Sequence, residues 1–319
     1  MILIKSVHQD ISTVMVGEWL LYLGGSFTVI NDGDLISNIQ YSTQENFIFK
    51  TTSGKHINLK SVSSYWYRRG SWMFDFSQVQ LKKVPALFGN SVRDEWSKLY
   101  NLLMLHLKKR NSIGSDLTDE LNKLEVLEIA NQVGLAIPKS LVTSLKSEVL
   151  SFFGNTSIIS KTISEVILTE IEGIAYTNRT TGIDSNALPE SFFPSLFQEN
   201  IEKRYELRVF ILNQVCYSMA IFSQTDEQTK VDFRNYNYRQ PNRNVPFQLP
   251  LHIETKLLKL MEHLGLSTGS IDLIVNNSLE YIFLEVNPDG QFGMVSSPCN
   301  YNLEKVIASQ LMNSNELRR

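Results

Sequence analysis

The sequence contains few of the residues that build disulfide scaffolds, metal clusters or membrane spans. Among its 319 residues there are two cysteines, Cys216 and Cys299, and five histidines. Two distant cysteines form neither a disulfide framework nor a ligand-spaced cluster, and the scattered histidines argue against a histidine metal site. No hydrophobic run approaches the roughly 20 residues that a membrane helix requires. The first residues, MILIKSVHQD, lack a signal-peptide pattern, so a reducing cytoplasm is the expected setting.

An excess of positive charge and the common nucleotide-binding loops are also missing. The formal net charge is −3 at pH 7, and the isoelectric point is near 6.0. This balance gives no general case for nucleic acid or an anionic membrane as a partner. Neither G-x-x-x-x-G-K-[ST] nor a G-x-G-x-x-G after a strand occurs in the sequence, which argues against P-loop and Rossmann sites.

The first third of the chain has the pattern of a small α/β domain. A strand is predicted over residues 2–7, a helix in DISTVMVGEWLLYLG and a second strand in FTVIND. A hairpin in QENFIFKTTSGKHINL and an amphipathic helix over 91–109 follow. The polar, turn-rich KRNSIGSDLTD then predicts the end of a domain that spans 1–115.

The remainder predicts a central part over 116–197 and a C-terminal part over 198–319. A helix from Glu120 to Val133 precedes the strand SIISK, and polar residues 169–190 indicate a hairpin or loop. LFQENI, ELRVFIL and VCYSMAIF are predicted to be adjacent strands of one antiparallel sheet. A helix over 251–264 and a hairpin of IDLIV and YIFLEVN around NNSLE follow.

Oxygen-bearing side chains cluster in this last hairpin. Glu285 and Asn287 are two residues apart on a strand, so they share a face. If the hairpin closes around Ser278 and Leu279, Asp272 lies opposite Glu285 on that face. Such an oxygen site suits Mg²⁺ that is completed by water and substrate phosphates. The alternative is a solvated acidic hairpin whose side chains only face water.

Three cationic residues are candidates for binding phosphate. Lys161 ends the apolar strand SIISK, and Arg208 lies among core-type residues in ELRVF. Lys123 is on the preceding helix, where its periodicity favours an ordinary surface lysine. Arg208 also has a structural alternative, because Glu206 shares its face and could be its ion-pair partner.

The order of these motifs resembles the ATP-grasp ligases. A strand-end lysine, then QEN, ELRV, DFR, a strand Asp and E-x-N follow one another as in that family. HQDIST, VGEWL, SFTVIND and WYRRG, with NKLEVLEIANQVGLAIPKSLVT and YELRVFI, resemble the ATP-grasp maturases of ribosomal peptides. The likeness is to the microviridin-type cyclases and the grasp-with-spasm group, over nearly the whole chain. It implies an α/β (α+β) ATP-grasp fold with an N-terminal α/β domain, a small central domain and a C-terminal antiparallel-sheet domain.

The resemblance also implies roles for individual residues. Lys123 and Lys161 would contact ATP phosphates, with Lys161 also near the adenine. Glu199 with the backbone of Asn200 and Ile201 would contact the adenine edge. Glu206 would lie near the ribose or phosphates, and Arg208 would stabilise the transferred phosphoryl group. Arg234 would lie near the γ-phosphate and the substrate carboxylate. The Mg²⁺ ligands would be Asp272, Glu285 and Asn287. The loop over 162–177 has few glycines where relatives close a glycine-rich loop, so no lid residue is assigned.

The expected function is ATP-dependent macrocyclisation of a precursor peptide with a leader and a core. An Asp or Glu side chain would be joined to a Ser or Thr hydroxyl as an ester, or to a Lys amine as an amide. Alternatives are a ligase that adds free amino acids to a small molecule or protein terminus, and a non-catalytic ATP-binding regulatory module. The resemblance leaves a homodimer open. Tyr67, Arg68 and Arg69 form either a structural cation–π cluster or a dock for the substrate carboxylate.

Overall fold

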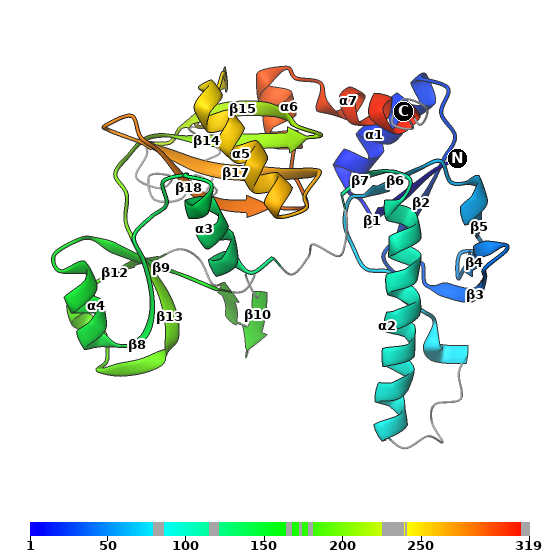
Figure 1. The fold of residues 1–319 in the computed structure, drawn as a ribbon, viewed down its shortest axis with the longest axis horizontal. Coiled ribbons are helices and arrows are strands. Elements are labelled where there is room, and N and C mark those ends of the chain that lie inside the picture. Colours follow the sequence, from blue (N-terminus) through cyan, green and yellow to red (C-terminus); the bar gives the residue numbers. More distant parts are fainter. Residues whose placement is uncertain are drawn as a thin grey trace. The chain divides into compact units, whose positions relative to one another are not determined.

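The computed structural model describes residues 1–78, 86–114, 121–163, 168–171, 174–177, 181–224, 239 and 241–313. The chain forms two compact units, one of residues 1–119 with 300–319 and one of residues 120–299 (Figure 1). Among the described residues, the short 3₁₀ segments Leu59–Ser61, Phe76–Gln78 and Ser185–Ala187 connect larger elements. Within the described residues, no helix is both long and apolar enough to cross a membrane.

The first unit is built on a parallel sheet of order β2-β1-β6-β7. Its strands are β1 (Ile2–Ser6), β2 (Phe27–Asn31), β6 (Ser64–Tyr67) and β7 (Asn111–Ile113). Helix α1 (Ile11–Tyr22) is capped at its N-terminus by Asp10, whose carboxylate accepts a hydrogen bond from the Thr13 amide at 2.7 Å. Helix α1 packs against α7 (Leu303–Met312). Helix α2 (Ala86–Lys108) contacts β7. The predicted strand–helix–strand start is therefore confirmed.

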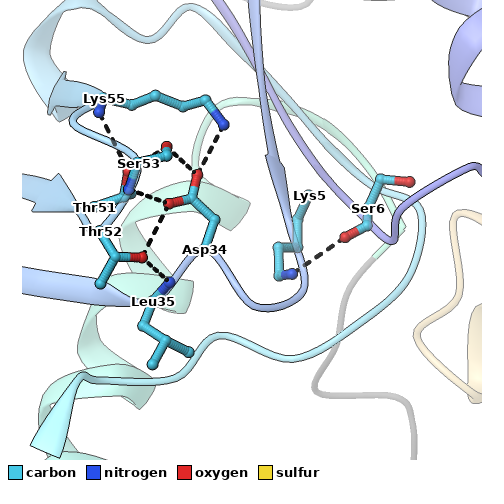
Figure 2. A network of polar contacts seen from close by, with 8 residues as sticks. All are labelled: Lys5, Ser6, Asp34, Leu35, Thr51, Thr52, Ser53 and Lys55. Atoms are coloured by element: carbon cyan, nitrogen blue, oxygen red, sulfur yellow. Dashed lines mark hydrogen bonds and ion pairs between the residues drawn. The ribbon is translucent and has the colours of Figure 1, made fainter. Parts of the chain in front are cut away.

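A small antiparallel sheet of β3 (Ile36–Ser42), β4 (Asn46–Thr51) and β5 (His56–Asn58) completes the first unit. The loop before β3 is fixed by Asp34, as Figure 2 shows. Its carboxylate accepts from the Ser53 amide at 3.0 Å, the Ser53 hydroxyl at 2.7 Å and Lys55 Nζ at 2.7 Å. Burial opposes ionisation, but the hydrogen bonds from Lys55, Ser53 and Thr51 outweigh it and hold the pKa of Asp34 well below its usual range.

The second unit contains two main sheets, and the first has the order β12-β9-β13-β8. Its elements are β8 (Ser140–Leu145), α4 (Lys146–Phe153), β9 (Ile158–Lys161), β12 (Thr181–Ile183) and β13 (Ser191–Glu199), beside a separate hairpin of β10 (Leu168–Ile171) and β11 (Ile174–Thr177). LFQENI was expected to join ELRVFIL and VCYSMAIF in one sheet, but its strand is β13, which pairs with β8 and β9. That expectation is wrong, because alternation reports the burial of a strand and not the identity of its neighbours.

The other main sheet is antiparallel, with the order β16-β15-β14-β17-β18. Its strands are β14 (Lys203–Leu212), β15 (Val215–Phe222), β16 (Arg243–Phe247), β17 (Thr268–Asn276) and β18 (Tyr281–Asn287). One face forms the core with α3 (Lys123–Gln132) and α5 (Leu251–His263) (Figure 1). The short helix α6 (Gly293–Cys299) contacts β14, β15 and β16.

Two elements lie elsewhere than the expected domain limits of 116–197 and 198–319 suggest. Helix α3 supplies Val126, Leu127 and Ala130 to the core of the C-terminal sheet. Helix α7 belongs to the first unit, where Asn111 Nδ2 donates to the Gln310 carbonyl at 2.7 Å and the Ser64 hydroxyl to the Leu311 carbonyl at 2.6 Å. Both helices bury their apolar faces against elements that are distant in the sequence.

Candidate functional site

Alternation along β14 and β17 gives the C-terminal sheet one apolar face, while the opposite face carries the polar side chains together with Phe210 and Ile274. Leu207, Val209 and Ile211 of β14 belong to the core cluster, as do Ile271, Leu273 and Val275 of β17. Successive strand residues point to opposite faces, so Glu206 and Arg208 share the other face with Ser270 and Asp272. We call this side of the sheet the polar face.

A β-bulge in β18 places Glu285 on the polar face. The pairs Val275–Tyr281 and Leu273–Phe283 continue regularly from the turn, after which the register shifts by one residue and Asp272 pairs with Glu285. Without this extra residue, Asp272 would face Leu284, and Glu285 would share the face of the buried Phe283. The predicted pairing of Asp272 with Glu285 is thus confirmed in register, and the bulge is its physical cause.

Arg208, Asp272 and Glu285 form one row across three neighbouring strands. Arg208 Nη1 lies 2.7 Å from Asp272 Oδ1 and 2.8 Å from Oδ2, and both residues are buried. A single guanidinium nitrogen therefore contacts both oxygens of the carboxylate that was predicted to bind a cation. The structural alternative, in which Glu206 is the ion-pair partner of Arg208, is replaced by two other pairs, because Glu206 pairs with Lys203 and Arg208 with Asp272.

Glu206 lies two residues before Arg208 and has its own buried partners. Its Oε1 is 2.6 Å from Lys203 Nζ, and its Oε2 accepts from the Ser223 hydroxyl at 2.7 Å. Burial is the largest influence and raises the pKa of Glu206 above its usual value, and the opposing effects of Lys203 and Ser223 do not cancel it. The fold thus resists the ionisation of this carboxyl group.

Three buried polar atoms on the polar face lack hydrogen-bond partners within the described part of the chain. They are Arg208 Nε, Ser270 Oγ and, further away on β16, Asn244 Oδ1. Buried polar atoms are nearly always paired, so such exceptions are expected where a ligand supplies the partner. Arg208 and Ser270 lie beside two carboxylates and an amide, Asp272, Glu285 and Asn287. That set fits Mg²⁺, which binds proteins through one or two carboxylates and takes its other ligands from phosphates and water.

Larger acidic or histidine clusters are not part of this site. No group of three or more His, Cys, Asp or Glu side chains that could hold a metal ion occurs among the described residues. Asn287 Oδ1 accepts the Asp289 amide at 3.0 Å, which fixes the turn that follows β18. A carbonyl oxygen has two lone pairs, so this contact leaves Asn287 able to bind a cation.

Both predicted lysines reach the end of β9. Lys161 is the last residue of that strand, as the sequence predicts, and it pairs with Leu196 of β13. Lys123 is the first residue of α3, and its Nζ donates to the carbonyl of Thr162 at 3.4 Å. The half-buried Lys123 is therefore more than a solvated helix residue, since it contacts the position that directly follows Lys161.

The predicted adenine-binding segment joins β13 to β14. Glu199 ends β13, and its Oε1 accepts the Lys139 amide at 2.9 Å while its own amide donates to the Lys139 carbonyl at 3.0 Å. The Asn200 amide donates to the Ser157 carbonyl at 2.8 Å, and Ile201 follows in the connection. Arg234 lies outside the described residues.

Lys203, Ser223 and Ser270 are neighbours of the site that sequence patterns did not single out. Their contacts or positions place them beside Glu206 and Asp272. For Ser270 a signal existed, because it precedes Asp272 by two residues and so shares its face. Lys203 precedes Glu206 by three residues, a spacing that gives no such indication on a regular strand, and the register of β14 is irregular between Lys203 and Tyr205.

A cavity of about 340 Å³ in the first unit offers a different environment. It lies between α1 and β2 and is lined largely by apolar side chains, with Asp10 and Glu18 as its acidic residues. Asp10 already caps α1 through Thr13 and pairs with Arg68 Nη2 at 3.4 Å. No Lys or Arg is among the lining residues, so this cavity lacks groups that would bind phosphate.

Comparisons with known proteins agree with the fold of both units. No family model and no curated protein matches the chain. An RiPP-associated ATP-grasp ligase of Chryseobacterium gregarium, solved with ADP and a leader and core peptide, is 25% identical with a TM-score of 0.78 and covers 97% of this chain and 94% of its own. The macrocyclase MdnC of Microcystis aeruginosa, bound with the precursor peptide MdnA, is 25% identical with a TM-score of 0.77 and covers 98% of this chain and 100% of its own.

A more distant structure shows the same fold. The ATP-grasp ligase PsnB, complexed with Mg, ADP and a phosphomimetic variant of a minimal precursor, is 16% identical with a TM-score of 0.72 over 98% of both chains. The order of strands, the polar face and these matches all indicate the same fold. The chain has the ATP-grasp fold and, over nearly its whole length, is similar to RiPP-associated ATP-grasp ligases and macrocyclases, as its motifs indicated.

Proposed function

We propose that the protein is an ATP-dependent macrocyclase that acts on a ribosomally made precursor peptide. The observation that carries this proposal is the row of Arg208, Asp272 and Glu285 on the polar face of a sheet whose fold matches peptide-binding ATP-grasp enzymes. In those two neighbours the described ligands are ADP with a leader and core peptide, and a precursor peptide. We expect ATP and Mg²⁺ to bind this chain.

The chemistry follows from the weak electrophilicity of a carboxylate. An oxygen of an Asp or Glu side chain in the peptide attacks the γ-phosphorus of ATP, and ADP leaves. A hydroxyl or amine of the same peptide then attacks the acyl carbon, loses its proton and displaces phosphate. The ring is an ester if a Ser or Thr hydroxyl attacks and an amide if a Lys amine attacks. The balance for each ring is one ATP consumed and one water removed from the peptide.

The chain's own residues would serve this reaction by positioning and by charge. Asp272, Glu285 and Asn287 would hold Mg²⁺, which neutralises charge on the phosphates when bound. Arg208 would exchange part of its contact with Asp272 for the transferred phosphoryl group, and Lys123 and Lys161 would bind phosphate oxygens. Stabilising charge in this way is the main demand of phosphoryl transfer, so no protein nucleophile is needed.

The segment after β13 would recognise the base. Glu199 would accept the N6 donor of adenine, while the backbone of Asn200 and Ile201 would contact the ring edge. Glu206 would lie near the ribose or phosphates. Arg234 would serve the γ-phosphate and the substrate carboxylate. The leader is expected to bind outside the catalytic cleft and so raise the effective concentration of the core.

Mass spectrometry of a candidate peptide tests this function. The peptide encoded beside the gene would be incubated with the protein and Mg-ATP, and each ring should remove the mass of one water while releasing one ADP. Hydroxylamine should divert an acyl phosphate to a hydroxamate, and removal of the leader should slow ring formation strongly. A peptide that gains the mass of an amino acid would instead identify a ligase for free amino acids. Binding of ATP without a mass change in any neighbouring peptide would identify a regulatory module.

A further inference from the structure

Ser270 is a buried residue for which the fold alone gives no use. It is 0% exposed, and its Oγ has no hydrogen-bond partner among the described residues. A buried hydroxyl without a partner costs free energy that alanine at the same position avoids. The sequence therefore keeps a polar atom where the folded chain by itself is better served by a methyl group.

Its position on the sheet suggests what the hydroxyl contacts. Ser270 pairs with Phe210 of β14 on one side and with Asn287 of β18 on the other. It shares its face with Asp272, two residues further along β17. Side chains that lie directly opposite in an antiparallel ladder have Cβ atoms about 5 Å apart, so a serine and an asparagine there can form a hydrogen bond.

Asn287 has two chemically different ends to satisfy. Its Oδ1 accepts the Asp289 amide at 3.0 Å and keeps a second lone pair that can bind a cation. When that oxygen faces a cation, the Nδ2 group turns toward an acceptor, and Ser270 Oγ lies across the ladder on the same face. Neighbours of this kind orient metal ligands, and their loss typically weakens metal binding by about tenfold or more.

We propose that Ser270 is a positioning residue of the cation site and accepts a hydrogen bond from Asn287 Nδ2 when Asn287 Oδ1 binds the metal. This inference rests on the proposed function, because it takes Asn287 as a ligand. It goes beyond that function by assigning a purpose to a buried hydroxyl next to the ligand set. It also predicts that Ser270 stabilises the loaded site while destabilising the empty fold.

Binding of Mn²⁺ in place of Mg²⁺ tests the proposal without turnover. Electron paramagnetic resonance counts free Mn²⁺ during titration of the full chain in the presence of ADP. The Ser270→Ala variant should bind Mn²⁺ about tenfold more weakly than the wild type, with ADP affinity in the absence of metal unchanged. Its Tm should be equal to or higher than that of the wild type, because the substitution removes an unpaired buried hydroxyl.

Ser218→Ala is the matched control. Ser218 is also buried, at 3% exposed, but it pairs with Val209 on the apolar side of the sheet. Its substitution should leave Mn²⁺ affinity unchanged. Ser270→Cys is a second test variant of similar size, whose weakly accepting sulfur should reproduce the loss of Mn²⁺ affinity even if the alanine variant folds poorly.

A double-substitution cycle separates positioning from a general disturbance. In an Asn287→Ala background, Ser270→Ala should have no further effect on Mn²⁺ affinity, because the side chain through which it acts is gone. A full tenfold effect in that background would overturn the proposal, as would wild-type Mn²⁺ affinity in Ser270→Ala. Failure of the wild type itself to bind Mn²⁺ with ADP would overturn the cation site of the proposed function as well.

Discussion

Asp34 in the first unit and Glu206 in the second are buried carboxyl groups with a lysine partner at nearly the same distance. Lys55 Nζ lies 2.7 Å from Asp34, whose side chain is 7% exposed, and Lys203 Nζ lies 2.6 Å from Glu206, whose side chain is 8% exposed. Yet the pKa of Asp34 is lowered and the pKa of Glu206 is raised. An ion pair of a given length therefore does not decide whether the fold favours or resists the charge.

The surroundings of the two carboxyl groups explain the difference. Asp34 accepts from a backbone amide and hydroxyl groups as well as from Lys55, and Lys55 remains partly in water (Figure 2). Glu206 and its lysine are both buried, and the charge of Asp272 opposes ionisation further. A carboxylate with many local donors stabilises a loop, whereas carboxyl groups that crowd one buried face have most to gain from a bound cation.

The largest expected contrast between the two regions is in turnover. Glu285→Gln should lower kcat by about a thousandfold or more while the protein stays folded, because a neutral amide places a cation less well than a carboxylate. Asp34→Asn is the control in the first unit and should leave kcat unchanged. Peptide-dependent release of ADP measures both variants. Normal ADP release by Glu285→Gln would make Glu285 an ordinary strand-end carboxylate.

Stability should show the opposite contrast. Asp34→Ala should lower the free energy of unfolding by about 2–3 kcal/mol, because it leaves Lys55 and the Ser53 donors without their acceptor. Glu45→Ala is the matched control, since the Glu45–Lys60 pair is similar in length at 2.9 Å but exposed. It should cost less than about 1 kcal/mol. Urea unfolding measures both, and equal losses would mean that the Asp34 network contributes no more than a surface pair.

The base-recognition segment gives a smaller effect. The wild type should prefer ATP to GTP, because a carboxylate accepts the adenine N6 donor and repels the guanine O6 acceptor. Glu199→Gln keeps an acceptor for the Lys139 amide, so the junction of β8 and β13 should persist. The added NH₂ donor should lower the ratio of the rate with ATP to the rate with GTP by about tenfold, or about 1.4 kcal/mol. Equal rates with ATP and GTP in the wild type would show that Glu199 does not read the base.

Sequence reasoning located the polar face for a reason that the structure makes clear. Period-two alternation is a local property, so the shared face of Glu285 and Asn287 and the strand-end position of Lys161 could be predicted. The pairing of Asp272 with Glu285 was also predicted, although the turn itself runs from Asn276 to Glu280. The bulge that makes this pairing possible has no signature in the sequence, since Leu284 is an ordinary strand residue.

Long-range packing could not be predicted in the same way. The amphipathic pattern of α3 shows that one side is buried, but not that it is buried against the C-terminal sheet. The return of α7 to the first unit and the assignment of LFQENI to the central sheet likewise depend on contacts between distant segments. Ser270 could not be recognised as a neighbour of the site because serine is common, and only its burial in the assembled sheet distinguishes it.

The pH dependence of stability gives the smallest effect and the most direct comparison of Asp34 with Glu206. The lowered pKa of Asp34 stabilises the fold above its unfolded pKa of about 3.9, and this contribution is lost as pH falls through the folded value. The raised pKa of Glu206 has the opposite sign, with stability present below its unfolded pKa of about 4.3 and lost as pH rises through the folded value. The loss in free energy of unfolding caused by Asp34→Asn, relative to the wild type, should therefore grow as pH rises from acid values. The loss caused by Glu206→Gln should shrink over the same range. Both changes should be on the order of 1 kcal/mol. Urea unfolding of the three proteins from pH 3.5 to pH 7 measures the slopes, and slopes of the same sign would show that the two carboxyl groups do not differ in the way their surroundings imply.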